Sequence, residues 1–511
     1  MRIMGRTVGE LGFHAQALSI DRLFPGPVDW CCMTSSLIQV GRPQPVRNTA
    51  ASSTTIGIVN LGCSKNQVDS EIMLGTLVRD GFKLTGDPKE AEVVIINTCG
   101  FIEEAKQESI NSIIEHGKLK RSGACRILIA AGCLAQRYQG DLIKELPELD
   151  GVVGTGEFGK IAEICRALLA PRKRRQRLWI SEPPYLYDAD APRLRLGKAH
   201  SAYVKIAEGC NRTCAFCAIP IMRGKQRSRP VESIVAEAKR LAAAGVKEIN
   251  LISQDTINYG IDLGLRHGFA TLLRELVKVK DLRWIRPFYL YPQQVTDELL
   301  DLYAGEETIT KYIDMPLQHI NDRMLKRMRR LGNRSAITSL VERIRTRIPR
   351  VTFRTGFIVG FPGETEGAFE ELMQYVKEAE FDRVAVFLYS DEEDTPAASL
   401  DDKVERSVME ARRNEILCVQ ESIAAAKGRA RIGSVLEVLV DGASEETEWQ
   451  LEGRHEGLAP EIDGVVYIND VAPRITHLPR AWPNVPVPMP GEMVKVEITD
   501  AALYDLIGHI V

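Results

Sequence analysis

The stretch Glu208-Gly-Cys-Asn-Arg-Thr-Cys-Ala-Phe-Cys217 spaces three cysteines as C-x3-C-x2-C. We call this segment the cysteine loop, with Cys210, Cys214 and Cys217 as its candidate ligands. Such a loop can give three thiolates to a four-iron cluster and leave the fourth iron without a protein ligand. Zinc is the alternative, but zinc sites more often use paired C-x2-C or Cys/His sets, and the sequence nearby supplies no second pair. The spacing therefore predicts an iron-sulfur cluster with one open iron.

The cysteine loop follows the first of six strand-like runs, which alternate with helix-like runs. The strand-like runs cover residues 203–207, 248–252, 284–290, 312–315, 352–359 and 384–388. The helix-like runs cover residues 232–244, 268–279, 295–303, 322–330, 335–347 and 366–379. Alternation of this kind predicts parallel βα units, and six units are too few to close an eight-stranded barrel. We expect an open, partial (β/α)6 barrel with its active site at the carboxyl ends of the strands, where the cysteine loop lies.

Three more cysteines each stand at the end of an apolar, β-rich run. The runs 56–61, 93–98 and 126–131 are followed by helix-like patterns at 67–79, 101–120 and 136–146. We call these residues the strand-end cysteines (Cys63, Cys99 and Cys133). In an open parallel sheet the carboxyl ends of the strands share one edge, so the three thiols are expected to converge on a second cluster. The alternative is that small apolar cysteines merely fill an α/β core.

Composition and cysteine usage are those of a globular enzyme in a reducing compartment. The chain has 511 residues, 44% hydrophobic and 26% charged, which fits several domains. Eleven cysteines, mostly in ligand-like spacings, argue against a secreted disulfide framework and for a cytoplasmic protein. The longest nearly uninterrupted apolar run, 127–135, is too short to span a bilayer, and charged residues near the N-terminus argue against a signal peptide. No membrane partner is expected.

Composition also divides the chain into five segments. Residues 1–54 are expected to form an extension without a fold of its own, either a disordered tail or the product of an upstream start codon that the cell does not use. The remaining segments are an N-terminal α/β cluster domain (55–170), a basic linker (171–198), the partial barrel (199–428) and a third domain (429–511). Five of the seven residues 171–177 are basic. They indicate a solvated linker, with a contact to ribosomal RNA as the alternative.

The third domain is predicted to be a small antiparallel β-barrel. Short alternating runs at 435–440, 464–468 and 493–499 are separated by Gly/Pro turns. Residues 430–511 contain five basic and fourteen acidic residues, a formal net charge of −9. This charge suits a basic protein partner better than RNA. We call Glu445, Glu446 and Glu448 the acidic run; it is either a steering element or merely a solvated loop.

The cysteine loop resembles the signature of the radical S-adenosylmethionine (SAM) enzymes. From about residue 56 onward the chain resembles the methylthiotransferases of that superfamily, which combine an N-terminal cluster domain, a radical SAM core and a C-terminal TRAM barrel. The transfer RNA branch usually has Gln-Met-Asn after its first cysteine and Gly-Gln-Asn after its second barrel strand, and neither is present. Several motifs are instead similar to the ribosomal protein branch: Leu61-Gly-Cys-Ser-Lys-Asn-Gln-Val-Asp-Ser-Glu71, Met222-Arg-Gly224, Ser253-Gln-Asp-Thr256, Tyr389-Ser-Asp-Glu-Glu393 and Ala459-Pro-Glu-Ile-Asp-Gly464.

This resemblance implies that SAM binds the open iron and is cleaved to a deoxyadenosyl radical. Phe216 stands where the family carries an aromatic residue. Polar residues after the second strand are candidates for the methionine end of SAM, although a simple polar turn explains them equally well. The segment 356–364 follows a β-branched run, and its glycines permit close approach of adenine, although glycine–proline turns are common. The candidate SAM-binding residues are therefore Phe216, Ser253, Gln254, Gly356, Gly360 and Glu364.

The implied reaction is methylthiolation of the β-carbon of one aspartate in ribosomal protein S12. The implied cofactors are two 4Fe-4S clusters and SAM, the latter as both methyl donor and radical source. The implied partners are S12, free or in the small subunit, and an electron donor such as flavodoxin or ferredoxin. Two other functions stay open: a transfer RNA methylthiotransferase acting on a modified adenosine, and a non-catalytic iron-sulfur binding module.

Overall fold

The computed structural model describes residues 39–40, 53–171, 176–182, 185–444, 450–471 and 487–511. The chain divides into two compact units: Met1–Tyr185 with Ala191–Leu196, and Leu186–Asp190 with Gly197–Val511. Nearly all of the predicted extension, residues 1–54, lies outside the described residues. Within it, β1 (Gln39–Val40) pairs antiparallel with β8 (Arg193–Leu194). Across the described ranges, no helix combines the length and apolar character that crossing a membrane requires.

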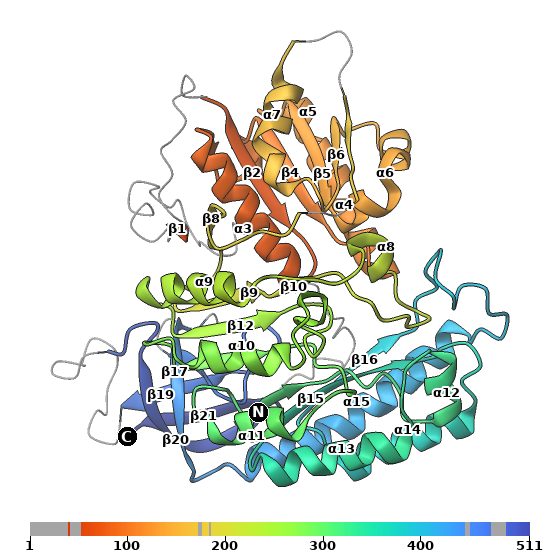
Figure 1. Cartoon of the computed structure of the whole chain (residues 1–511), viewed down its shortest axis with the longest axis vertical. Coiled ribbons are helices and arrows are strands. Elements are labelled where there is room, and N and C mark those ends of the chain that lie inside the picture. The colour runs from red at the N-terminus through yellow and green to blue at the C-terminus, as the bar shows by residue number, and fades with distance from the viewer. Residues whose placement is uncertain (1–38, 41–52, 172–175, 183–184, 445–449, 472–486) are drawn as a thin grey trace, which may run out of the picture. The chain divides into compact units, whose positions relative to one another are not determined.

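The first unit is built on a parallel sheet with the strand order β3-β2-β4-β5-β6-β7, coloured red to yellow in Figure 1. The predicted parallel α/β arrangement is confirmed. Strands β3, β6 and β7 were not predicted, because runs of two or three residues show no alternation. The elements are β2 (Thr55–Asn60), α3 (Ser64–Arg79), β3 (Lys83–Leu84), η1 (Pro88–Glu90), β4 (Val93–Thr98), α4 (Glu103–Gly117), α5 (Leu119–Ser122), β5 (Ile127–Gly132), α6 (Cys133–Glu145), β6 (Gly151–Val153), η2 (Phe158–Lys160), α7 (Ile161–Leu169) and β7 (Leu178–Trp179).

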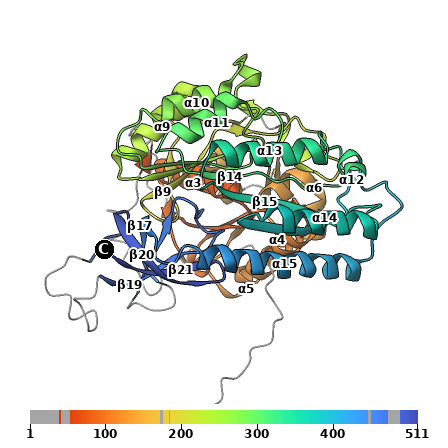
Figure 2. The same cartoon turned by 90° about the horizontal axis from the view of Figure 1, so that it is seen from below.

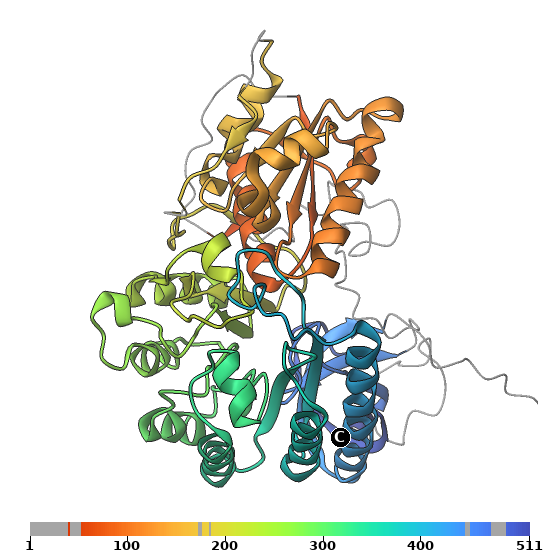
Figure 3. The ribbon, with the colours of Figure 1, turned by 90° about the vertical axis from the view of Figure 1, so that its right-hand side faces the viewer.

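Helices cover both faces of this sheet (Figure 3). Successive residues of a strand point to opposite faces. Val93 and Ile95 of β4 therefore join a core with α3 and α7, whereas Val94 and Ile96 join a second core with α4 and α6. Burial on both faces explains why the central strands are nearly continuous apolar runs.

The second unit contains the predicted open, partial barrel. Its parallel strands form two groups, β13-β12-β9 and β14-β15-β16, which a single bridge between Ile285 and Ile309 connects. The predicted strands and helices are present to within a few residues. They are β9 (Ser201–Lys205), α9 (Val231–Ala243), β12 (Glu248–Ile252), α10 (Gly268–Leu276), β13 (Trp284–Pro287), α11 (Asp297–Gly305), β14 (Tyr312–Asp314), α12 (Asp322–Arg327), α13 (Arg334–Arg347), β15 (Thr352–Val359), α14 (Glu366–Ala379) and β16 (Arg383–Leu388).

The longest helix, α15 (Arg406–Arg429), was not predicted. It packs against α14, β16 and β20 (Met493–Ala502) and runs towards the C-terminal barrel (Figure 2). Its buried residues include Arg412 and Gln420 beside Met409, Ile416 and Ala424. Two polar residues on the buried face hide the apolar period that predicts a helix. Four short elements complete this part of the unit: β10 (Ala207–Glu208), α8 (Ile219–Arg223), β11 (Arg227–Ser228) and η3 (Ile261–Leu263).

The C-terminal strands form the predicted small barrel. Within the described residues the barrel is closed in the order β17-β18-β19-β21-β20, and its pairings are antiparallel except for β19 with β21. Strands β18 and β21 go beyond the prediction. The strands are β17 (Val435–Ala443), β18 (Leu451–His455), β19 (Val466–Val471), β20 (Met493–Ala502) and β21 (Asp505–Ile510).

The barrel meets the core at the amino-terminal ends of the core strands. Arg454 of β18 donates to Glu248, the first residue of β12, with Nη1 2.7 Å from Oε2. The Tyr312 hydroxyl, at the start of β14, donates to Asp463 Oδ2 at 2.7 Å. These contacts lie at the end of the strands opposite to the end that precedes the cysteine loop, so the carboxyl ends remain available for a site.

Candidate active site

The cysteine loop leaves the carboxyl end of the first core strand, β9, as the sequence predicted. Backbone hydrogen bonds hold it at three points. The Cys210 amide donates to Gly224 O at 3.1 Å, the Ala215 amide to Met328 O at 2.9 Å, and the Ala397 amide to Ala215 O at 2.9 Å. The loop is thus fixed by segments that follow other elements of the core.

The three thiols of the cysteine loop lie in a desolvated place. Cys210 is 8% exposed, and Cys214 and Cys217 are half-buried. Burial raises the pKa of Cys210 to about 11 and that of Cys217 to about 12, and the neighbouring Cys214 thiol adds to both shifts. Such thiols are poor nucleophiles, because only the thiolate attacks. A metal that binds them displaces their protons, so the donor set suits a metal group better than covalent catalysis.

Two arginines donate to sulfurs of the loop. The Arg212 amide lies 3.4 Å from Cys210 Sγ, and Arg330 Nη1 lies 3.8 Å from Cys214 Sγ. Among the described residues, no three His, Cys, Asp or Glu side chains are grouped as ligands of a single ion. A four-iron cluster is wider than one ion and holds its thiolates farther apart. Three thiols, two of whose sulfurs accept a hydrogen bond, fit a cluster.

The predicted polar residues after β12 lie beside the cysteine loop. The Ser253 hydroxyl is fully buried and lies 3.0 Å from the Thr256 hydroxyl, inside its own turn. Gln254 Nε2 donates to Glu208 Oε1 at 2.9 Å. Burial opposes ionisation of Glu208, but nearby cations, Arg223 foremost, lower its pKa to about 2. Gln254 thus donates its hydrogen bond to a carboxylate that stays charged.

Several buried polar atoms around this turn have no hydrogen-bond partner among the described residues. They belong to residues on β12's turn and on the segment around the cysteine loop: Gln254 Oε1, Asp255 Oδ1, Gln226 Oε1 and Arg212 Nη2. Leaving a buried donor or acceptor unpaired costs about 1–3 kcal/mol, so such groups usually have a partner. This set contains one donor, Arg212 Nη2, and three acceptor oxygens. The place therefore fits a ligand that carries both ammonium and carboxylate groups, as SAM does.

The predicted glycine segment, residues 356–364, begins within β15 and is shaped by α15. Gly360 has a φ of 75°, and a Cβ there would stand 2.2 Å from Met409 Cγ, so only glycine fits. Glu364 uses both carboxylate oxygens internally: Oε2 accepts from the Gly360 amide at 2.6 Å and Arg412 at 2.7 Å, and Oε1 lies 3.0 Å from His319 Nε2. Glu364 is therefore placed to hold the loop rather than to face a ligand. At Gly356 a Cβ would make only ordinary contacts.

The aromatic of the cysteine loop packs towards the same glycine segment. Phe216 is half-buried and joins the apolar cluster that contains Phe361, Tyr389 and Met409. The rings of Phe361 and Tyr389 meet edge to face, with centroids 5.2 Å apart. The cysteine loop and the glycine segment, distant in sequence, thus share one apolar support.

The strand-end cysteines follow three strands that are neighbours in the first unit, β2, β4 and β5. Asn66, which the sequence analysis did not single out, ties their ends together. Its fully buried amide Nδ2 donates to Leu61 O at 2.9 Å and Thr98 O at 3.0 Å, and its Oδ1 lies 3.7 Å from Cys133 Sγ. A Cβ at Gly62 would lie 3.2 Å from Cys99 Sγ. The three cysteines therefore stand at one edge of the sheet.

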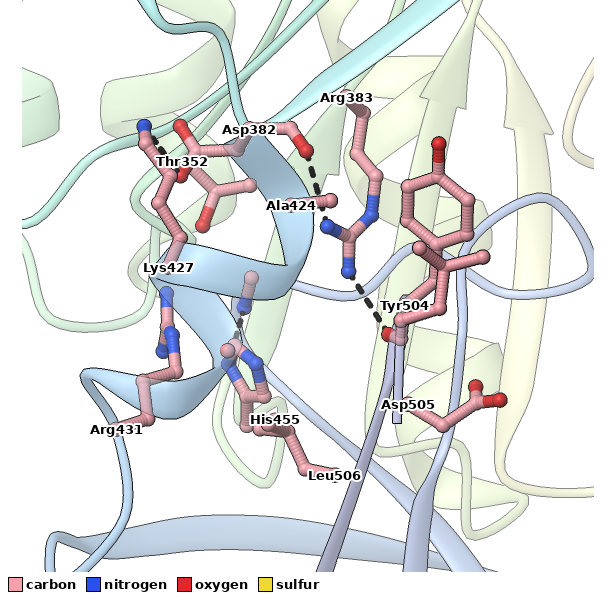
Figure 4. Close-up of a pocket in the computed structure, with 13 residues that line it drawn as sticks. Thr352, Asp382, Arg383, Ala424, Lys427, Arg431, His455, Tyr504, Asp505 and Leu506 are labelled. Atoms are coloured by element: carbon pink, nitrogen blue, oxygen red, sulfur yellow. Dashed lines mark hydrogen bonds and ion pairs between the residues drawn. The ribbon is translucent and has the colours of Figure 1, made fainter. Parts of the chain in front are cut away.

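A small cavity of about 30 Å³ lies elsewhere, between α15, the barrel and the starts of β15 and β16 (Figure 4). Arg383 donates there to Tyr504 O at 3.1 Å, and Lys427 pairs with Asp382 at 3.0 Å. Burial lowers the pKa of His455 well below its usual range, and Arg431 adds to the effect. A cavity this small holds only one or two waters. It is a small polar cavity where α15 and the barrel meet the amino-terminal ends of the strands, and it is not a substrate site.

Comparison with known proteins agrees with this architecture. Residues 55–154 match the Uncharacterized protein family UPF0004, 204–376 the Radical SAM superfamily and 432–511 the TRAM domain. A solved radical SAM methyltransferase, TsrM from Kitasatospora setae with tryptophan and a SAM analogue bound, shares the fold. It has a TM-score of 0.51 and 14% identity over 73% of this chain and 89% of its own.

Curated relatives cover almost the whole chain. The ribosomal protein uS12 methylthiotransferase RimO of Anaeromyxobacter sp. (strain K) is 48% identical over 459 residues, which are 90% of this chain and 94% of that protein. RimO of Myxococcus xanthus (strain DK1622) is 46% identical over 89% of this chain and 91% of its own, and RimO of Geobacter sulfurreducens is 45% identical over 89% and 98%. The predicted resemblance is therefore confirmed, and the chain belongs to the RimO family of radical SAM methylthiotransferases.

Proposed function

We propose that this protein methylthiolates the β-carbon of an aspartate in ribosomal protein S12. The observation that carries the proposal is the cysteine loop at the carboxyl end of β9, beside buried polar atoms that lack partners, in a chain of the RimO family. The loop supplies a cluster with an open iron, and the unpaired atoms supply a place for SAM.

Different residues of the core bind the first cluster and position SAM. Cys210, Cys214 and Cys217 hold the first cluster, which, when bound, supplies the electron that cleaves SAM. Gln254 and its turn orient the polar end of SAM, and Ser253 stabilises that turn from within. An apolar wall lined by glycines is formed by Phe216 and residues 356–360. Glu364 stabilises this wall by accepting a hydrogen bond from the Gly360 amide. The protein thus positions SAM and excludes water, which is its share in cofactor chemistry.

The strand-end cysteines would hold a second 4Fe-4S cluster, which would carry or supply the sulfur for transfer. Their position after adjacent strands and the Asn66 clamp beneath them support this assignment. Cys133 is buried, Cys99 is half-buried and Cys63 is exposed, so this site has one open side. The methyl group comes from a second molecule of SAM.

The partners follow from this chemistry. S12 is the substrate, free or in the small subunit, and the work takes place in the cytoplasm with ribosomes. Electrons come from a one-electron donor such as flavodoxin or ferredoxin. The basic linker offers a contact to ribosomal RNA; residues 172–175 of it lie outside the described residues. We keep the five-part division of the chain at 54, 170, 198 and 428 as part of the proposal.

A transfer RNA substrate is less well supported. The motifs of that branch are absent, and the third domain is strongly acidic. Part of this acidity is used inside the protein, since Asp441 and Asp463 bond to core residues. The acidic run lies outside the described residues. A non-catalytic iron-sulfur module would not need the unpaired polar atoms beside the cysteine loop.

Mass spectrometry of S12 from cells with and without this gene tests the proposal. We expect a methylthio mass increment on one aspartate of S12 that disappears with the gene. An increment on transfer RNA and none on S12 would favour the first alternative. No increment on either, with no deoxyadenosine formed from SAM under reducing, anaerobic conditions, would favour the second.

A further inference from the structure

A tyrosine stacked between two arginines stands next to the cysteine loop. The guanidinium carbon of Arg212 lies 3.8 Å from the ring centroid of Tyr291, and that of Arg330 lies 4.0 Å from it. Tyr291 is buried, and each arginine also contacts a cysteine of the loop. The stack therefore holds both arginines beside the loop, where Arg330 contacts Cys214 Sγ through its guanidinium and Arg212 contacts Cys210 Sγ through its backbone amide.

The two arginines differ in charge balance. Arg212 Nε donates to Asp255 Oδ2 at 2.6 Å, so its charge is neutralised by a buried carboxylate. Arg330 is 8% exposed and donates to Pro316 O at 2.6 Å and to Cys214 Sγ at 3.8 Å. In the part of the chain that the structure describes, no carboxylate lies within ion-pairing distance of Arg330.

A buried cation without a counter-ion is unstable, because it has lost its hydration. The backbone nevertheless holds Arg330 in place. Its amide donates to Leu325 O at 2.8 Å, and the preceding residue, Arg329, has a φ of 53°, a left-handed conformation that costs about 1–2 kcal/mol for a residue with a side chain. Strain of this kind persists where the surrounding structure requires it. Arg330 contacts the Tyr291 ring and the sulfur of Cys214, and the sulfur is the partner that becomes a thiolate when it binds a cluster.

We propose that Arg330 sets the reduction potential of the cluster held by the cysteine loop and that Tyr291 holds its guanidinium against Cys214. The inference rests on the proposed function, in which these cysteines are the ligands. Reduction adds one electron, taken from the one-electron donor, and so adds one negative charge to the cluster. A cation hydrogen-bonded to a ligand sulfur stabilises the reduced form more than the oxidised form, and so raises the potential.

The test is a potentiometric titration of the reconstituted full-length protein, followed by the electron paramagnetic resonance signal of the reduced cluster. The strand-end cysteines are changed to Ala in every sample, so that one cluster remains. We expect Arg330→Gln to lower the ratio of reduced to oxidised cluster at fixed potential about tenfold, a shift of about 59 mV to more negative potential for one electron. Arg330→Lys keeps the charge and should shift the potential less. Arg343→Gln, an exposed arginine of α13 bonded to Val295 O, should not shift it.

Iron content and the parent spectrum separate the possible failures. A parent without a cluster signal, or with iron that survives loss of the cysteine loop's thiols, overturns the ligand assignment and the proposed function. A normal parent signal with an unchanged potential in Arg330→Gln overturns the present inference alone. If Arg330→Gln does not assemble a cluster, Tyr291→Leu decides. A more negative potential there, with Arg330 still present, supports the inference, and an unchanged potential overturns it.

Discussion

Arg454 joins the C-terminal barrel to the core through the buried carboxylate of Glu248, and within the barrel it pairs with the buried carboxylate of Asp441. From β18 its guanidinium donates to Glu248 Oε2 at 2.7 Å and to both oxygens of Asp441, at 2.7 and 3.1 Å. All three side chains are almost completely buried. Arg454→Met keeps much of the side-chain volume and removes the charge. Two almost completely buried carboxylates then lose a cation.

Removing one partner of a buried ion pair costs about 3–5 kcal/mol. Both carboxylates keep other partners, since Glu248 still bonds Arg286 at 3.0 Å and Asp441 still bonds His200 at 2.7 Å. We therefore expect Arg454→Met to lower the free energy of unfolding of the second unit by about 3 kcal/mol, the low end of that range.

An exposed ion pair across the same interface provides the matched control. Arg283 Nη2 lies 2.6 Å from Glu437 Oε1, again joining core to barrel, but the two side chains are 51% and 47% exposed. Exposed pairs contribute about 0–1 kcal/mol, so Arg283→Gln should change the free energy of unfolding by less than about 1 kcal/mol. Comparing the two variants thus separates the effect of burial on the free energy of unfolding from the effect of simply connecting the barrel to the core.

The loss should also depend on pH. Burial opposes ionisation of Glu248 and Asp441, but Arg454 outweighs it and lowers the pKa of both carboxyl groups. An acid with a lowered pKa in the folded state stabilises the fold above its unfolded pKa and loses this contribution as the pH falls. The difference between parent and Arg454→Met should therefore be largest near pH 7 and should shrink below about pH 4.

Urea unfolding followed by near-ultraviolet circular dichroism at pH 7 and at about pH 3, below the unfolded pKa of both carboxyl groups, measures both effects. A loss below about 1 kcal/mol at pH 7, the value expected for an exposed pair, would refute the reasoning. So would a loss that stays the same at both pH values, since the charges of the carboxylates would then not cause it.

Three further predictions follow from the cysteines, the glycine segment and the acidic run. Changing the cysteine loop's three cysteines to Ala should leave about half the iron and abolish SAM cleavage, whereas the same change of the strand-end cysteines should keep cleavage but lose sulfur insertion; iron assays that show no loss in either variant contradict two clusters. Gly360→Ala should lower the free energy of unfolding by about 2 kcal/mol or more, because Gly360 has a positive φ and a Cβ there would clash with Met409. The control Gly367→Ala in α14, where a Cβ meets nothing within 4 Å, should raise the free energy of unfolding by about 1 kcal/mol. Equal effects of the two variants in denaturant titrations would show that α15 does not constrain the loop. Changing the acidic run to Lys should slow association with S12 at low salt and less so at high salt, as stopped-flow measurements can check; association as fast as the parent's at low salt would exclude a steering role.

The sequence alone was sufficient where a structure depends on neighbours in the chain. The six core strands, their helices and the α/β pattern of the first unit follow from local apolar periodicity, and so does the position of the cysteine loop after β9. Helix α15 and strand β18 were not predicted, because they depend on residues that are distant in the chain. Arg412, Gln420 and Arg454 lie on their buried faces and are stabilised by distant partners, so these segments look polar when read alone.

Only the tertiary structure decides which charges meet. Arg330 reaches Cys214 across 116 positions of the chain, and Arg454 reaches Glu248 across 206. No local spacing encodes such pairs, because each partner alone reads as an ordinary polar residue. Cysteine spacing within one loop fixes the donors of a cluster, since the eight residues from Cys210 to Cys217 limit how far apart the thiols can stand. The charges around that cluster are set by folding, which brings distant segments together and removes the water that would otherwise screen them.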